Sequence, residues 1–74
     1  MTMTTSFTTR IRRWDTGKLM RAKDAAMAKS NIRITLSIEK SMHIADVYIE
    51  INGDELQVSA FKEWVQTFAL QTPV

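Results

Sequence analysis

The sequence has no cysteine, a single histidine and only two glycines in its 74 residues. Without cysteine, the chain forms no disulfide and offers no thiolate for zinc binding or nucleophilic chemistry. Two glycines are also too few for a glycine-rich phosphate-binding loop. A chain this short buries only about 60% of its unfolded surface, so self-association is a candidate source of the missing stabilisation.

Long apolar runs are missing as well. No stretch approaches the roughly 20 apolar residues that a membrane-spanning helix needs. The N-terminus is polar, and no basic stretch followed by an apolar run marks a secretory signal. The hydrophobic content of 45% is that of an ordinary globular chain. We therefore expect a soluble cytoplasmic protein with no membrane partner.

Constellations of catalytic side chains are scarce. His43 is the only histidine, and a lone loop histidine is far more often solvent-exposed than catalytic. The tripeptide Asp-Thr-Gly at 15–17 matches that of aspartic proteases, but that chemistry needs two such carboxylates on buried loops. A helix cap is the better interpretation, because arginines precede this tripeptide and Lys18 follows it. We predict that the protein is not an enzyme and binds no metal and no cofactor.

Period-two alternation of apolar and polar residues predicts strands over 31–39 and about 44–51. The Asn-Gly pair at 52–53 is preferred in two-residue type I′ turns. It therefore predicts a hairpin into a third strand at about 54–58.

The hairpin register places Glu50 opposite Glu55 on the wet face of the sheet. Pairing of the first two strands would bring Arg33 across from Glu50 and partly neutralise this pair. We interpret the two glutamates as solvated surface and not as an acid–base or metal site.

The remaining segments predict two helices. Residues 16–29 are rich in helix formers, with Asp15 or Thr16 as the cap. Their apolar stripe is thin, so this helix is expected to pack lightly or to need a partner. A second helix follows Ser59 as its N-cap and ends before Pro73. Its apolar stripe covers the sheet and consists of Phe61, Trp64, Val65 and Phe68.

Together these elements define an α+β fold. We predict an N-terminal basic arm and helix, a three-stranded antiparallel sheet, and a C-terminal helix packed on one sheet face. Residues 1–14 are either a basic, threonine-rich arm or an edge strand, since Met3, Phe7 and Ile11 share one parity. The second choice would add a fourth strand to the sheet. Residues 15–74 form a single compact α+β domain.

Charge is divided unequally between the two halves of the chain. Residues 1–37 contain eight Lys or Arg and two acidic residues, a net charge of +6. Residues 38–74 contain two Lys and six acidic residues, a net charge of −4. A basic half predicts an acidic partner such as nucleic acid. The alternative is that the two halves pair with each other, within one chain or between copies.

The feature with the most functional promise is the run Arg-Ile-Arg-Arg-Trp at 10–14. Guanidinium groups bind phosphates, and an indole stacks on bases or contacts cations. The competing interpretation is that Trp14 anchors the arm to the core, while the arginines stay in water or pair with the acidic half. The residues predicted to bind nucleic acid or another partner are Arg10, Arg12, Arg13, Trp14, Lys18, Arg21 and Lys23.

Two functional hypotheses follow from this patch. The first is a small non-enzymatic binding or regulatory protein whose basic N-terminal patch engages an acidic macromolecular surface, either nucleic acid or nucleoprotein. The second is a phage-type inhibitor or adaptor that docks on a larger host protein by protein–protein contact. The expected partners are therefore nucleic acid or a protein with an acidic surface. A homodimer could form through a sheet edge or through the basic and acidic halves.

Overall fold

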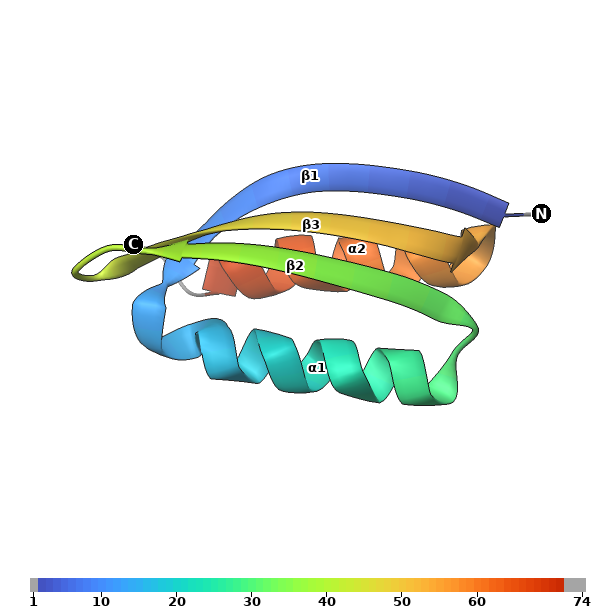
Figure 1. Cartoon of the computed structure of the whole chain (residues 1–74), viewed down its shortest axis with the longest axis horizontal. Helices are drawn as coiled ribbons and strands as arrows, with labels where there is room; N and C mark the ends of the chain where they lie inside the picture. Colours follow the sequence, from blue (N-terminus) through green and yellow to red (C-terminus); the bar gives the residue numbers. More distant parts are fainter. Residues whose placement is uncertain (1, 72–74) are drawn as a thin grey trace.

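The computed structural model describes residues 2–71, which form one three-stranded sheet and two α-helices (Figure 1). This arrangement confirms the predicted α+β class with a C-terminal helix contacting the sheet. The elements in chain order are β1 (Thr2–Arg12), the 3₁₀ turn η1 (Arg13–Asp15), α1 (Thr16–Lys29), β2 (Ile32–Lys40), β3 (Ile44–Asp54) and α2 (Glu55–Gln71).

Strand β3 is the centre of the sheet, with the strand order β1-β3-β2. It is antiparallel to both neighbours, so β1 and β2 run parallel to each other and are connected through α1. This is a split β-α-β unit, in which a third strand lies between the two parallel strands. The chain order β-α-β-β-α supplies five consecutive elements of the six-element β-α-β-β-α-β pattern.

Residues 2–12 form an edge strand, the second of the two alternatives that the sequence left open. Threonine is β-branched and suits a strand, and the apolar residues of one parity point toward the core. Strand β1 pairs with β3 from Thr2↔Asp54 to Arg12↔Ile44. It is one of the three strands rather than a fourth.

The predicted Asn-Gly turn is wrong. Both residues lie inside β3, flanked by β1 and β2, and the predicted third strand at 54–58 is the end of β3 followed by the first residues of α2. Helix α2 begins at Glu55, where the Gln57 backbone N–H donates to an Asp54 carboxylate oxygen at 3.4 Å. Asp54 thus stands where Ser59 was expected to cap the helix, and Ser59 lies within the helix.

Two cross-strand contacts that were predicted from the hairpin register are also absent from the structure of residues 2–71. Glu55 belongs to α2, so it does not face Glu50, which lies between Ser6 and Thr35. Arg33 lies across from Asn52 and not from Glu50, because β2 and β3 pair two residues away from the expected register.

Gly53 is needed because β2 approaches closely, not because the chain turns. Its φ is +152°, and a Cβ at this position would lie 2.7 Å from the Asn31 carbonyl oxygen and 2.7 Å from Ile32 Cγ2. A strand glycine often marks such a close approach of another backbone.

The core lies between the sheet and the two helices. Helix α2 packs against β1 and β3, whereas α1 packs against β2. The buried apolar residues are Ile11, Leu19, Ile32, Ile34, Ala45, Val47, Ile49, Ile51, Val58, Phe61 and Val65.

Helix α1 has the predicted bounds of 16–29 and packs lightly, as expected. Only Leu19 and Thr16 of this helix are buried. The predicted stripe of α2 is partly right: Phe61 and Val65 are buried, whereas Trp64 is 42% exposed. The predicted helix stop at Pro73 lies outside the described residues.

Candidate functional site

The predicted basic cluster lies at the junction where β1 ends and α1 begins. The chain leaves the sheet after Arg12 and makes one 3₁₀ turn before α1. The Thr16 hydroxyl donates to the Arg13 carbonyl oxygen at 2.9 Å, which closes this turn. The Arg13 backbone N–H donates to the His43 carbonyl oxygen at 3.0 Å. The second of these bonds fixes the junction against the connection between β2 and β3.

Asp15 is the buried anchor of the junction, with a relative exposure of 2%. Its carboxylate accepts a hydrogen bond from Arg12 Nε at 2.7 Å and lies 3.8 Å from Lys18 Nζ. Asp15 occupies the N-cap position of α1, but its side chain makes no capping hydrogen bond. The carboxylate therefore orients Arg12 instead, since a charge-assisted bond to a guanidinium is strong and directional.

Trp14 projects into solvent next to these charges. It is 64% exposed, and the Arg12 guanidinium carbon lies 5.8 Å from its ring centroid, within cation–π range. The expectation that Trp14 anchors the arm to the core is therefore not met. Trp14, Lys18 and Arg21 are spaced at i, i+4 and i+7, which favours one side of the helical segment.

We call this exposed group the junction patch; it consists of Arg12, Arg13, Trp14, Lys18 and Arg21. Arg13 and Arg21 are exposed and have no acidic side chain within ion-pair distance among residues 2–71. Arg12 and Lys18 share the buried Asp15. The patch thus combines two unpaired cations with an oriented arginine and an exposed indole.

The other two predicted residues lie apart from this patch. Arg10 is on the open face of the sheet, where its Nε donates to an Asp46 carboxylate oxygen at 2.9 Å. This pair joins the basic and acidic halves of one chain, as one alternative predicted. Lys23 is mostly covered, and its Nζ lies 3.1 Å from a carboxylate oxygen of Asp24.

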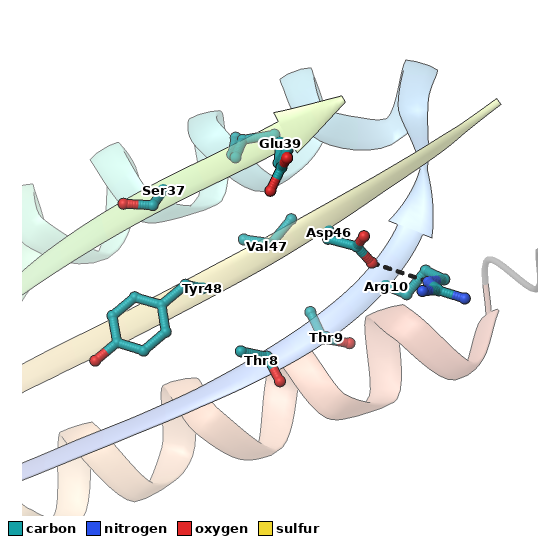
Figure 2. A pocket seen from close by; sticks show the side chains of 9 residues that line it. Thr8, Thr9, Arg10, Ser37, Glu39, Asp46, Val47 and Tyr48 are labelled. Carbon is teal, nitrogen blue, oxygen red and sulfur yellow. Dashed lines mark hydrogen bonds and ion pairs between the residues drawn. The ribbon is translucent and has the colours of Figure 1, made fainter. Parts of the chain in front are cut away.

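The open sheet face carries a hollow that the sequence did not indicate. Figure 2 shows it over the three strands, with both helices behind them. Tyr48 is central, between Thr8 of β1 and Ser37 of β2. The sequence could not reveal this group, because it depends on the pairing of β1 with β3. The hollow is lined by Thr8, Thr9, Arg10, Ser37, Ile38, Glu39, Asp46, Val47 and Tyr48.

A second hollow is apolar and lies between the two helices. One wall is formed by alanines of α1, and the other by Phe61 and Trp64 of α2. The rings of Phe61 and Trp64 stack with centroids 5.8 Å apart, and those of Trp64 and Phe68 stack at 5.2 Å. The predicted apolar stripe of α2 therefore forms an aromatic ladder, part of which reaches solvent.

His43 is exposed in the connection between β2 and β3. Among the described residues, no three His, Asp or Glu side chains gather as a metal-binding group. Within residues 2–71, neither helix is both long and apolar enough to cross a membrane.

Comparisons with protein-family models, with curated proteins and with solved structures found no match to this chain.

Proposed function

We propose that the protein is a small non-enzymatic binding protein whose junction patch contacts the phosphates of nucleic acid. The observation that carries the proposal is the exposed Trp14 beside Arg12, with Arg13 and Arg21 lacking acidic partners in the described chain. Single-stranded nucleic acid is bound by this combination of cations for the backbone and an aromatic ring for the bases.

The arginine next to the indole is oriented before any ligand arrives. The bond from Arg12 Nε to Asp15 uses one donor of the guanidinium and leaves others for a phosphate. Because the buried Asp15 also attracts Lys18, it lowers the net charge of the patch by one. The proposed interaction is therefore modest in strength and relies on Arg13 and Arg21 for most of its electrostatic attraction.

The open sheet face does not support the same role. Asp46, Glu39 and Glu50 are exposed there, and Tyr48 is its aromatic residue. Their carboxylates would repel a phosphate backbone, so a sheet-face mode of RNA binding is disfavoured. Arg10 cannot offset this repulsion fully, because its positive charge is already paired with the carboxylate of Asp46.

The test is binding of a fluorescein-labelled single-stranded DNA, followed by fluorescence anisotropy at low salt. The double variant Arg13→Gln, Arg21→Gln is expected to bind about tenfold or more weakly, because each lost phosphate contact removes part of the attraction. The matched control is Arg33→Gln, Lys40→Gln, which removes two exposed cations from β2. This control is expected to change the affinity less than about threefold.

Equal losses in the two double variants would contradict the assignment of the patch, since only the total charge would then matter. Wild-type protein that is folded but binds no DNA would contradict the proposal itself.

A second candidate is an adaptor or inhibitor that docks on a larger protein. The apolar hollow between the helices favours it, because stacked aromatic side chains with a partly exposed Trp64 would suit an apolar segment of a partner. A folded wild-type protein without affinity for DNA would favour this candidate.

A further inference from the structure

The outer edge of β1 is a long and undefended strand edge. β1 is at one end of the sheet order and spans 11 residues. It pairs with β3 in one unbroken register, so it contains no bulge. It has no proline, and none of the residues from Thr2 to Thr9 carries a charged side chain. Proteins normally protect such an edge with charges, proline or a bulge, and an unprotected edge pairs with another strand.

The core-facing side of β1 and the middle of its open side are also symmetric about the middle residue of the strand. Phe7 stands at the centre of Thr2–Arg12. On the core side, Met3 and Ile11 are equally far from Phe7. Thr5 and Thr9 occupy the two core-side positions next to Phe7. On the open side, Ser6 and Thr8 flank the centre. An antiparallel copy of the strand would therefore meet like with like from Thr5 to Thr9 and pair Met3 with Ile11.

We infer that β1 pairs with β1 of a second copy, antiparallel about a two-fold axis near Phe7, to form a six-stranded sheet. In this register, Met3 faces Ile11 of the second copy and Phe7 faces its own equivalent. Met3 and Phe7 are only half-buried in the single chain, so they gain cover. Aromatic and apolar cross-strand pairs of this kind stabilise sheets.

Charge argues for a second copy as the occupant of this edge. The cations of β1 are Arg10 and Arg12, at one end of the strand. In the antiparallel pair they face Thr4 and Thr2 of the second copy, so no like charges stand opposite each other. An edge built for a charged foreign strand would carry complementary charges along its length, and this one carries none up to Thr9.

The helices are compatible with this sheet. Helix α2 lies over β1 and β3. Neighbouring strands are about 4.8 Å apart, so α2, which lies over both β1 and β3, is about one strand spacing from the proposed two-fold axis. The two α2 helices would therefore lie about 10 Å apart, a normal packing distance. The Lys62 ammonium lies 5.8 Å from the Phe7 ring centroid, so the two Lys62 side chains would approach each other near the axis. Their repulsion limits the strength of the dimer.

The test compares two double variants by sedimentation velocity over a range of protein concentrations. In Ser6→Lys, Thr8→Lys, each lysine at position 6 faces a lysine at position 8 of the other copy. In the control Thr35→Lys, Ser37→Lys, the same charges stand on the other edge strand. Both pairs of positions are exposed and have the same β3 neighbours, Glu50 and Tyr48.

Wild type is expected to show a concentration-dependent dimer. The β1 double variant is expected to raise the dimer Kd about tenfold or more, and the β2 control about twofold or less. Wild type that stays monomeric at every concentration would overturn the inference, and so would equal weakening by the two variants.

A charge exchange keeps the inference testable if the lysine variant alone is perturbed in folding. Mixing Ser6→Lys, Thr8→Lys with Ser6→Glu, Thr8→Glu is expected to produce a heterodimer, because each lysine then faces a glutamate. A mixture that forms no heterodimer would overturn the β1 pairing. This inference rests on the strand edge, so it does not depend on the junction patch or on nucleic acid.

Discussion

Single residues set the shape of this protein where the chain is most crowded. Gly53 lies at the end of the central strand, between Met3 of β1 and Ile32 of β2. The space for its missing side chain is taken by the Asn31 carbonyl oxygen and by Ile32, the first residue of β2. Gly17 is the opposite case, because a Cβ there would have no atom within 4 Å.

The substitution Gly53→Ala is therefore expected to lower the free energy of unfolding by about 2 kcal/mol or more, through strain at positive φ and overpacking. Gly17→Ala is the control, and it should raise the free energy of unfolding by about 0.5 kcal/mol, because alanine favours the helix. Urea unfolding followed by circular dichroism measures both. A Gly53→Ala protein as stable as wild type would contradict the close approach of Asn31 and Ile32 to Gly53.

Arg12 and Asp15 show how one buried carboxylate organises an exposed patch. Asp15 is covered by the junction itself, so its bond to Arg12 is shielded from competing water. The guanidinium is thereby held near the Trp14 ring. Arg13 and Arg21 depend on no such anchor, which makes them suitable positions for removing charge without disturbing the fold.

At the scale of elements, α1 is the least secured part of the fold. Leu19 is its one fully buried apolar side chain, and the helix packs mainly against the edge strand β2. The central strand β3 is paired on both sides and supplies four buried apolar residues between 45 and 51. Stability should therefore fall from β3 toward α1.

We expect Leu19→Ala to lower the free energy of unfolding by about 2 to 4 kcal/mol, because it leaves a cavity under α1. Met20→Ala, at a position 46% exposed, is the control and should cost less than about 0.5 kcal/mol. Amide hydrogen exchange of the wild type should show slow exchange in β3 and faster exchange in α1. Slower exchange in α1 than in β3 would contradict this order of stability.

Local patterns predicted the elements that depend on local signals. The bounds of α1 and the alternation of β2 followed from helix formers and period two alone. The Asn-Gly pair gave a wrong prediction because its turn preference is also a local signal. In the structure, backbone pairing with both β1 and β2 keeps these two residues in β3. The alternation runs on through Ile49, Ile51 and Gly53, and the spacing of Val58, Phe61 and Val65 fits a helix that starts earlier.

The candidate site was only partly predictable for the same reason. The cluster at 10–14 was visible as a run of cations around an indole. The partner of Arg10 was not, because Asp46 lies 36 residues away and reaches it only through the register of β1 and β3. The burial of Asp15 was not predictable either, because it depends on how the junction packs. Asp15 pairs with Arg12 and Lys18 and leaves Arg13 and Arg21 without an acidic partner among the described residues.

At the scale of the whole molecule, the sheet separates two kinds of surface. One face is covered by the helices, and the other is open, with hydroxyls, carboxylates and a central tyrosine. The junction patch lies at one end of this elongated body, which measures 40 × 20 × 20 Å. The proposed β1 pairing would place two junction patches at opposite ends of one continuous sheet, so a single nucleic-acid strand could contact both.

The most direct test of the proposed function is the salt dependence of single-stranded DNA binding by the wild-type protein. If three or all four of the cations of the junction patch contact phosphates, a plot of log K against log salt concentration should have a slope of about −2 to −3. The Arg13→Gln, Arg21→Gln variant should reduce the magnitude of that slope by about 1 to 2. An affinity that does not change between about 50 mM and about 200 mM salt would contradict the account.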